Sequence, residues 1–357
     1  SSYETLKSGF IDKHEYILPD IILDKNLFNS QTYGSVDFQS NFKVHSYDTN
    51  KLTKFLVNDF DWKFKNFTHS SGLKGNILGK VKNVNYEAKN TSIYKDDPTN
   101  EVFGAFGFLT EMDFYKTSAN SSKHFFTPKM LLRYSPDHMR KEKDGARLNN
   151  LNIFELDRLN TYNNFESGLS ATLGFDYDLK NENQEFNFSI GQIVNEKENK
   201  NMPSSSSLDE KLSDVVGAAN LDINSKFNIS YNFAVDQNYN TLNYNEIGTN
   251  FNFDQIKFDI NYLQEREHIG NQEYMTAGID YTKGKNGLLS FKTKRNLVTN
   301  SSEFYNLSYE YLNDCLRAGL VYRREFYNDS ELGSENSLMF KVTFIPFGDV
   351  NSPLVNK

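Results

Sequence analysis

The stretch FNISYNFAVD, residues 227–236, shows the pattern that decides the fold of this chain. Its odd positions are Phe, Ile, Tyr, Phe and Val, and its even positions are Asn, Ser, Asn, Ala and Asp. A period of two places these two sets of side chains on opposite faces of a β-strand. One face is therefore apolar and the other polar. A soluble sheet can also show this pattern, so one strand alone leaves the class of protein open.

The same alternation recurs from end to end of the chain, with almost no helical periodicity in between. We count roughly sixteen such strands, many of them about nine to eleven residues long, as a tilted membrane-spanning strand requires. The clearest are residues 36–44, 60–65, 169–177, 186–191, 256–262, 275–281, 289–293, 305–311, 316–322 and 338–344. They predict an all-β protein, an antiparallel transmembrane β-barrel with an apolar outside and a wet lumen. In residues 242–253 the parity changes midway, which indicates a bulge.

The composition supports a barrel and excludes other classes. Of the 357 residues only 38% are hydrophobic, yet 15% are aromatic, with 30 Phe and 21 Tyr. Disordered chains are poor in aromatics, whereas barrels need apolar residues only at alternate positions and carry aromatic girdles. No run of about twenty apolar residues could form a membrane helix, so a membrane protein of this sequence must be a barrel. The net charge is -8 and the Lys and Arg residues are scattered, which excludes nucleic acid as a partner.

The connections between the strands give the barrel a direction. From residue 165 onward, short turns (180–185, 224–225, 254–255, 283–287 and 313–314) alternate with longer loops (194–212, 236–241, 264–272, 296–303 and 327–336). Outer-membrane barrels have short periplasmic turns and longer external loops, whereas sandwiches and propellers have no reason to sort their loops in this way. The first half is less regular, and residues 136–150 form a charged loop within it.

The sequence shows no pattern that points to catalysis or to a metal site. The six His have no pair at metal-ligand spacing, and no nucleophile-elbow, P-loop or EF-hand motif occurs. Inward carboxylates such as Asp176, Asp259 and Asp280 are interpreted as solvated residues that line a pore, rather than as general acids or bases. We therefore expect no enzyme activity, no metal and no cofactor.

Four segments resemble a known family. Residues 152–178, NIFELDRLNTYNNFESGLSATLGFDYD, resemble a segment of the LPS-assembly outer-membrane protein LptD (also called OstA, or organic solvent tolerance protein), in which an Asp-Arg pair precedes a Glu-x-Gly strand. Residues 186–194, FNFSIGQIV, with 212–217, LSDVVG, are similar to its next strand and Ser-Asp element. Residues 309–344 are similar to its final hairpins, and residues 14–23, HEYILPDIIL, to its Tyr-x-Leu-Pro strand. The resemblance covers nearly the whole chain.

The resemblance implies a barrel in the outer membrane of a Gram-negative bacterium that inserts lipopolysaccharide into the outer leaflet. It also implies two protein partners. One is an LptE-like lipoprotein plug in the lumen, and the other is an LptA-like periplasmic bridge that meets an N-terminal jellyroll domain. The jellyroll is missing here, no signal peptide precedes Ser1, and the family's barrel has more strands than this sequence shows. We therefore interpret residues 1–357 as the C-terminal, incomplete part of such a barrel.

The resemblance further implies a lateral exit for lipid at the seam between the first and last strands. The C-terminal side of this seam would be the strand that carries Leu338, Phe340, Val342 and Phe344. On the N-terminal side, Pro19 would remove a ladder hydrogen bond and weaken strand pairing locally. That property could ease the opening of a gate, but a strand start or a bulge is the interpretation that we prefer.

Cys315 is the only cysteine. It follows a short turn, which predicts a position near the periplasmic mouth, and by parity it shares a face with Arg317 and Arg323. A lone cysteine is often an inert small residue, but an odd cysteine in an oxidising compartment can mark a pairing partner elsewhere. The resemblance implies such a partner, because in the family a cysteine at this position joins the barrel to the periplasmic domain.

Cations lie on the inward faces of the last strands, where the phosphates of lipid A would favour them. They are Lys292, Lys294, Arg317, Arg323 and Lys341. Ordinary pore lining explains these residues equally well, and the inward Asp280 and Glu310 dilute their positive field. For Asp157 and Arg158 we expect a structural ion pair at a strand end.

Two other classes of protein remain open at this point. A general diffusion porin would need a constriction loop folded inward and no partner plug. A soluble, extracellular β-rich binding protein would be soluble without detergent. Against this second class, Phe60, Trp62 and Phe64 face one way with no evident partner layer.

Overall fold

The computed structural model describes residues 16–47, 51–119, 121–136, 138–143, 147–224, 226–266, 270–313, 315–326, 336–344, 348–351 and 355–356. These residues form one antiparallel sheet of 21 strands and one short 3-10 helix, Ser204–Ser206. Among the described residues, no helix is long and apolar enough to span a membrane.

The strands follow one another as hairpins, and their bounds match the alternating segments of the sequence. In chain order they are β1 (Tyr16–Ser30), β2 (Gly34–Tyr47), β3 (Lys51–Lys63), β4 (Phe67–Thr68), β5 (Leu73–Lys89), β6 (Thr99–Met112), β7 (Phe114–Thr117), β8 (Lys123–Ser135), β9 (Gly168–Lys180), β10 (Gln184–Asn195), β11 (Val215–Ile223), β12 (Phe227–Val235), β13 (Leu242–Phe253), β14 (Ile256–Glu265), β15 (Gln272–Lys283), β16 (Gly287–Asn296), β17 (Ser301–Leu312), β18 (Leu316–Glu325), β19 (Asn336–Phe344), β20 (Gly348–Asn351) and β21 (Val355–Asn356).

Four of the 21 strands, β4, β7, β20 and β21, are only two to four residues long, which leaves 17 long strands in the described part of the chain. This number agrees with the strand count expected from the sequence. Each long strand pairs with the long strands next to it in the chain. The register shifts where Ala234 and Val235 of β12 meet Tyr244 and Leu242 of β13. The bulge expected in residues 242–253 is therefore present, although it lies near the start of the strand and not midway.

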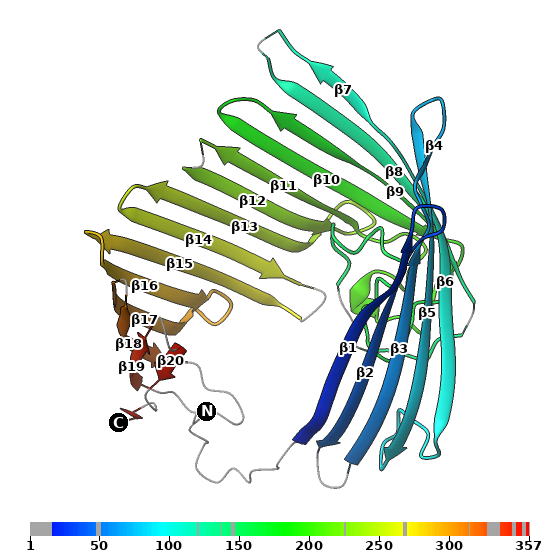
Figure 1. Ribbon diagram of the computed structural model, residues 1–357, viewed down its shortest axis with the longest axis horizontal. Helices are drawn as coiled ribbons and strands as arrows, with labels where there is room; N and C mark the ends of the chain where they lie inside the picture. Colours follow the sequence, from blue (N-terminus) through cyan, green and yellow to red (C-terminus); the bar gives the residue numbers. More distant parts are fainter. Residues whose placement is uncertain are drawn as a thin grey trace.

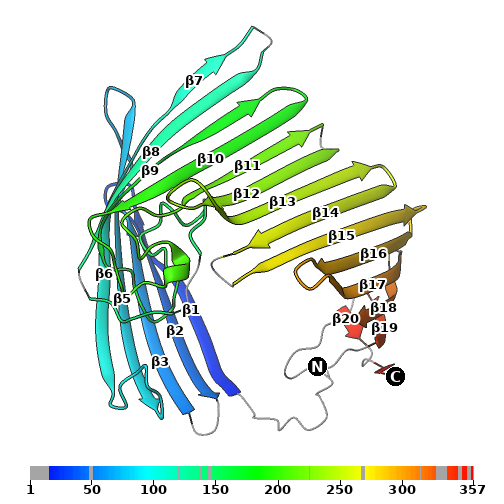
Figure 2. The ribbon, with the colours of Figure 1, turned by 180° about the vertical axis from the view of Figure 1, so that it is seen from behind.

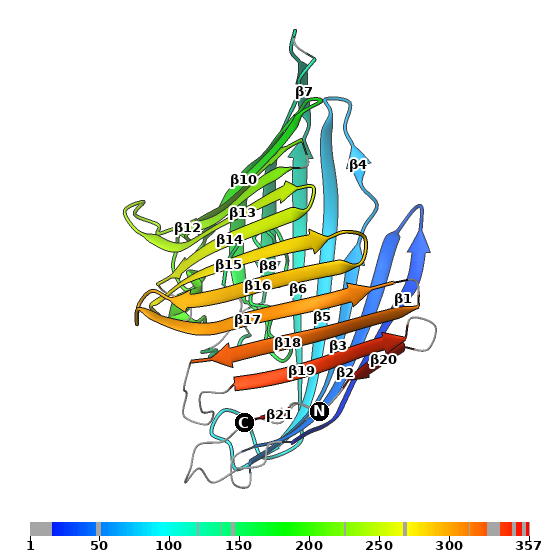
Figure 3. The same cartoon turned by 90° about the vertical axis from the view of Figure 1, so that its left-hand side faces the viewer.

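The sheet curves strongly and encloses a concave face (Figure 1). Within the described residues, β1 pairs only with β2, and β19 pairs with β18, β20 and β21. The sheet therefore has two edges and is not closed, as expected for an incomplete barrel. Seen from the side, the edge strands β1 and β19 run in clearly different directions (Figure 3).

The convex face is apolar, as the parity of the sequence predicts. Large apolar side chains on this face are exposed along the sheet, for example Phe60, Leu173, Leu307 and Leu338. Leu307 is 46% exposed and Leu338 is 48% exposed. Exposed apolar side chains on so many consecutive strands fit a lipid-facing surface and would be an aggregation liability in water.

The alternation of connection lengths holds in the second half of the chain, whereas the first half is less regular, as the sequence indicates: residues 64–72, which contain β4, and 113–122, which contain β7, are long connections at the end that otherwise carries short turns. The short connections include residues 31–33, 181–183, 254–255 and 284–286, all at one end of the hairpins. The long ones include residues 90–98, 136–167, 196–214 and 236–241, at the opposite end. Figure 2 shows the two longest connections, drawn in green, folded against the concave face of the sheet.

This position of the long connections corrects the expectation of a wet lumen. Where residues 136–167 and 196–214 lie against the strands, the concave face carries buried apolar side chains in two clusters. Alternation in the sequence predicts which side chains face the membrane, but the inward face is polar only where nothing covers it.

Candidate functional site

The concave face of the sheet, the lumen of the barrel, is the candidate site, and its first part is covered by the chain itself. We call the described residues between β8 and β9 that follow Pro136 (138–143 and 147–167) the luminal segment. The luminal segment supplies Leu156 and Phe165 to a cluster formed by inward residues of β3, β5 and β6. These inward residues include Phe55, Val57 and Val84, which are at most 2% exposed. Burying each such side chain contributes roughly 1.5–3 kcal/mol, so the luminal segment is docked and not loosely placed.

A fully buried ion network ties the luminal segment to the wall. The Arg158 Nε donates to Glu166 Oε2 at 2.8 Å, and its Nη2 donates to Glu166 Oε1 and to Ser170 Oγ of β9. From β8, the Arg133 Nε donates to the carbonyl oxygen of Leu156 at 2.7 Å, and its Nη2 donates to that of Glu166. Burial alone would raise the pKa of Glu166, but the charges of Arg133 and Arg158 and the hydrogen bonds from Arg158 outweigh it and lower that pKa.

A second buried cation, Lys82 of β5, holds the same segment. Its Nζ lies 3.0 Å from Asp157 Oδ2 and donates to the carbonyl oxygens of Thr161 at 2.5 Å and Asn164 at 3.3 Å. The ion pair expected of Asp157 with Arg158 at a strand end was wrong, because Asp157 pairs with Lys82 and Arg158 with Glu166. Both residues lie inside the lumen. Breaking a buried pair of this kind costs about 3–5 kcal/mol, because the remaining charge stays buried.

Arg140 anchors the luminal segment in another way. Its guanidinium carbon lies over three rings of or near β5 and β6, at 5.4 Å from the Tyr86 centroid, 5.6 Å from Tyr94 and 5.7 Å from Phe103. It also forms an ion pair with Glu101 of β6. Aromatic faces attract cations most strongly where water is excluded, so this contact holds the beginning of the luminal segment against the wall.

The second long connection, residues 196–214, extends the cover over β10 to β13. Met202 and Leu208 are buried in one cluster with Ile193, Val216 and Tyr244 of the wall. Polar contacts accompany this packing, since the Asn195 amide donates to the carbonyl oxygen of Glu210 at 2.7 Å and the Asn199 amide donates to that of Ser167 at 3.3 Å. The two long connections therefore hold each other as well as the wall.

The alternation in the sequence did not predict this covered wall. Its signal was present in Phe55, Leu56 and Val57, three consecutive apolar residues that break the alternation, and again in Leu131 and Leu132. In a strand of a water-filled barrel one of two neighbours should be polar, so apolar neighbours indicate that both faces are covered.

The five predicted cations lie on the other, open part of the wall, and they do not form one cluster. The Arg317 Nε lies 2.9 Å from Glu310 Oε1, and the Arg323 Nε lies 2.6 Å from Glu325 Oε1. Lys294 Nζ lies 3.9 Å from the centroid of the Tyr274 ring. Lys292 of β16 and Arg323 of β18 stand on either side of Asn306 of β17, and Lys341 stands opposite Gly319. Glu310 and Glu325 therefore weaken the positive field of Arg317 and Arg323.

The residues predicted for the seam lie on the two edges of the sheet. Pro19 lies in β1, where the register shifts between Ile17 and Asp20, so it sits in the bulge that we preferred. On β19, Leu338 and Phe340 are about half exposed, Val342 stands opposite Ala318, and Phe344 stands opposite Leu316. In β1, Ile21, Ile22 and Leu23 are 55–58% exposed although they point to both faces. Pairing of these two edges, and so the seam itself, stays a prediction.

Cys315 lies in the turn between β17 and β18, at the end that carries the short connections. Asn313 Oδ1 accepts hydrogen bonds from the backbone N–H groups of Cys315 at 3.0 Å and Leu316 at 2.7 Å. These side chain–backbone hydrogen bonds fix the backbone at the start of β18, and Cys315 is exposed. The predicted disulfide itself stays a prediction. Within the described part of the chain, no group of three or more His, Cys, Asp and Glu residues is placed to hold a metal ion.

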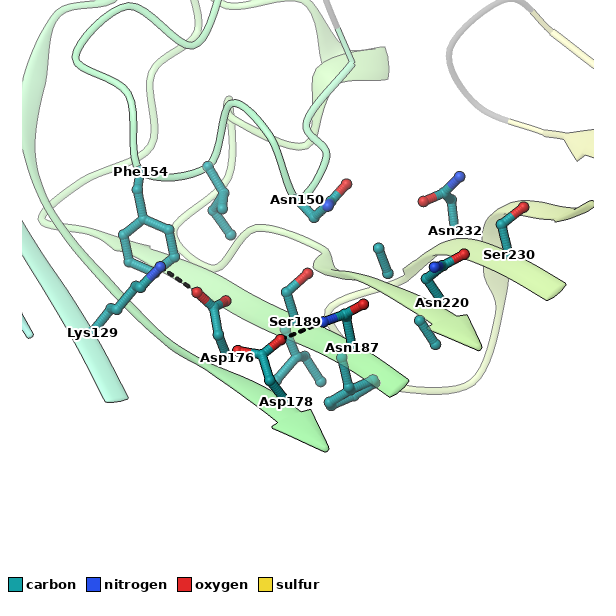
Figure 4. A pocket seen from close by; sticks show the side chains of 15 residues that line it. Lys129, Asn150, Phe154, Asp176, Asp178, Asn187, Ser189, Asn220, Ser230 and Asn232 are labelled. Atoms are coloured by element: carbon teal, nitrogen blue, oxygen red, sulfur yellow. Dashed lines mark hydrogen bonds and ion pairs between the residues drawn. The ribbon is translucent and has the colours of Figure 1, made fainter. Parts of the chain in front are cut away.

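Below the luminal segment, a hollow of about 420 Å³ opens between the segment and the wall of β8 to β12 (Figure 4). Phe154 and Asn150 face it from the segment, and inward Asn, Asp and Ser residues face it from the strands. The sequence analysis named only Asp176 of this group, because nothing in the sequence places the luminal segment above these strands.

An exposed apolar convex face and a concave face partly filled by the chain's own connections define a membrane β-barrel protein. A family model described as LptD, LPS transport system D, matches residues 3–296. The chain belongs to this family, which acts in lipopolysaccharide transport, and it is an outer-membrane protein.

Other comparisons add little. No curated protein matches the sequence. Two solved mutants of the Rhodopseudomonas blastica porin, one with five substitutions and one triple mutant, align with 89% of this chain and 99% of their own. Both are 10% identical with a TM-score of 0.33, which is too loose a likeness to carry an argument for a porin.

Proposed function

We propose that this chain inserts lipopolysaccharide into the outer leaflet of the outer membrane, as a passage without catalysis. One observation carries this proposal beyond family membership. The open, polar part of the lumen, formed by β15 to β19, ends at an edge of the sheet where β19 pairs onward, within the described residues, only with the short strands β20 and β21, whereas the part beside β3 to β14 is largely covered. A polar head group in the open part would lie next to an edge through which its acyl chains could reach lipid.

The chemistry of the two faces suits an amphipathic cargo. Acyl chains are excluded from a polar lumen, and sugars and phosphates are excluded from the membrane core, so both must cross together at a seam. An unpaired strand edge offers such a seam, and Pro19 in β1 donates no ladder hydrogen bond there. Lys292 and Lys294 could contact lipid phosphates, whereas Arg317 and Arg323 would first have to leave their carboxylate partners.

For partners, we propose an LptE-like lipoprotein that fills the open part of the lumen, and an LptA-like periplasmic bridge that joins through an N-terminal domain. Within the described residues the luminal segment reaches as far as β14, where Arg147 pairs with Glu265, and the inner face of β15 to β19 beyond it is where such a plug would fit. The complete protein, purified in detergent, should retain a lipoprotein of this kind. Consistent purification without one would remove the assignment of this partner.

Cys315 belongs to the same proposal. In the complete protein, Cys315→Ser should remove one band shift on non-reducing gels and slow barrel assembly, because the exposed thiol is positioned at the short-turn end. An unchanged disulfide pattern would leave Cys315 without the role proposed for it.

One feature also fits a diffusion porin, since the luminal segment is a loop folded inward. The family assignment favours lipid transport. Shutting off synthesis of the protein in its own cells separates the two functions. Lipid transport predicts that lipopolysaccharide disappears from the cell surface, measured with a surface-specific antibody, while small-solute uptake persists. Loss of solute uptake with unchanged surface lipopolysaccharide would contradict the proposal and support a porin.

A further inference from the structure

Two hairpins at the short-turn end of the sheet are longer than their neighbours. We call residues 64–76, which contain β4, and residues 113–126, which contain β7, the first and second extended hairpins. Lys74 of the first forms an ion pair with Asp113 of the second, and the Thr127 hydroxyl donates to Asp113 Oδ1 at 3.0 Å. Figure 3 shows β7 and the start of β8 projecting beyond the turns of the neighbouring strands. The second extended hairpin therefore stands out past the rim of the sheet and is tied to the first.

A line of aromatic rings crosses the outer face at the base of the second extended hairpin. By strand parity, Phe114, Phe126, Phe175 and Phe188 all lie on the convex face. Successive ring centroids along this line are 6.3, 5.2 and 5.9 Å apart, and Phe114 and Phe126 are 48% and 40% exposed. Aromatic belts of this kind lie where the membrane core meets the lipid head groups. The rings therefore mark the head-group level of the leaflet at the short-turn end.

Polar groups follow directly after the rings on the same face. Lys116 stands opposite His124 in the β7–β8 ladder. The His124 ring is held from both sides, since its Nε2 lies 2.9 Å from Ser118 Oγ and its Nδ1 lies 2.8 Å from the hydroxyl oxygen of Tyr177. Lys116 is exposed and forms no ion pair within the described part of the chain. A fixed imidazole, a hydroxyl and an unpaired cation therefore adjoin the aromatic belt on its water side.

The extended hairpins carry positive charge in a chain that is otherwise acidic. Together they contain four Lys and one Asp, a formal charge of +3 in a chain of net charge -8, and the one Asp is already paired with Lys74. On the other face of the second hairpin, Lys123 stands directly opposite Lys180 of β9, and like charges in this arrangement repel each other. An anion close to the hairpin lowers that repulsion, so the charge distribution favours a negatively charged ligand.

We propose that the outer face of the second extended hairpin binds an anionic glycerophospholipid of the inner leaflet. Lys116 takes the lipid phosphate, the imidazole of His124 lies beside it, and the acyl chains lie along the rings of Phe114 and Phe126. A free phosphate or an acidic peptide would use the cation but not the adjoining rings. Such a lipid site requires the outer-membrane location of the chain but not its proposed transport of lipopolysaccharide.

The test uses the full-length protein in detergent, stripped of co-purified lipid and analysed by native mass spectrometry with added lipid. Phosphatidylglycerol is compared with phosphatidylcholine of the same acyl chains, and the wild type should retain phosphatidylglycerol in preference. Lys116→Ala should weaken phosphatidylglycerol binding about fivefold, the usual effect of one lysine near an anionic membrane surface, and Lys116→Arg should retain it. The matched control Lys226→Ala, at an exposed position in the turn between β11 and β12 at the same end, should leave binding unchanged.

Three outcomes would overturn the lipid site: equal retention of the two lipids by the wild type, unchanged binding in Lys116→Ala, or an equal loss in Lys226→Ala. Glycerol 3-phosphate has the phosphate but no acyl chains, so it should not displace the lipid at equal concentration. Displacement would assign the cation to a free phosphate and contradict the lipid site. None of these outcomes depends on surface lipopolysaccharide, so failure of the lipid site and failure of the proposed function are distinguishable.

Discussion

Two regions of the same sheet share one outer face and differ on the inner one. Along β3 to β8, inward positions such as Val57, Val84 and Arg133 are buried under the luminal segment. Along β16 to β18, inward positions such as Asn306 and Arg317 face open lumen, and the Arg317 side chain is 48% exposed. The buried Arg133 has hydrogen bonds on several sides, whereas Arg317 has one neighbouring carboxylate.

The difference shows that alternation in the sequence predicts which side chains face lipid. It does not predict whether the inner face is covered by protein or open to water. Lipid demands apolar side chains on every strand, so the outer face is uniform. The inner face instead follows whatever covers it: apolar groups and fully paired charges under protein, and solvated polar groups under water. The inner face therefore shows which part of the lumen is filled and which is free for a cargo.

The largest effect should come from breaking the buried network. Arg158→Ala leaves the Glu166 carboxylate buried with one partner fewer, and we expect a loss of about 3–5 kcal/mol in the docking of the luminal segment. Limited proteolysis of the folded barrel should then cut within residues 138–167. The matched variant Arg317→Ala in the open wall should cost no more than about 1 kcal/mol. Equal protease resistance of Arg158→Ala and Arg317→Ala would contradict the difference between the covered and the open inner wall.

A somewhat smaller effect is expected from the apolar contacts. Leu159 of the luminal segment is fully buried in the cluster that contains Met202 and Ile193, so Leu159→Ala opens a cavity and should cost about 2–5 kcal/mol in urea unfolding of the refolded barrel. Leu307→Ala on the convex face removes the same atoms but opens no cavity, and should cost less. A larger loss of unfolding free energy in Leu307→Ala than in Leu159→Ala would contradict this comparison.

A smaller effect, dependent on pH, follows from Glu166. Because its pKa is lowered on folding, the stability it contributes is present above the usual value of 4.5 and is lost as the pH falls below that value through the folded pKa. Proteolytic release of the luminal segment should therefore increase at acid pH in the wild type. In Glu166→Gln, release at neutral pH should already be raised and should change less with acid. Parallel pH profiles of the two proteins would contradict this role of Glu166.

The sequence predicted the outer face and the hairpins well, because lipid contact imposes a local rule. The parity of Leu307 and Leu320, and the tight turn that carries Cys315, could be read directly from neighbouring residues. The luminal segment could not, because its position depends on the curvature of the whole sheet. Arg158 binds Glu166 and Ser170 close by in sequence, but the Lys82–Asp157 pair joins residues far apart, so the alternation of neighbouring residues cannot show it.

For the same reason, the predicted cations were placed on the correct face but not in one cluster. Parity put Lys292 and Lys341 inward, yet it could not show that Arg317 and Arg323 already have carboxylate partners. The hollow beside Phe154 was also beyond the sequence, since its two sides come from segments whose contact is not local.

The division of the lumen is tested most directly by the rate at which a water-soluble maleimide labels single cysteines on the two inner walls. Val84→Cys and Ser308→Cys are compared in the reduced protein, with the exposed Cys315 as an internal reference in each. We predict that Ser308→Cys is labelled at a rate similar to Cys315. Val84→Cys should stay unlabelled unless Arg158→Ala is added. Labelling of Val84→Cys as fast as Ser308→Cys in the otherwise intact protein would contradict the account.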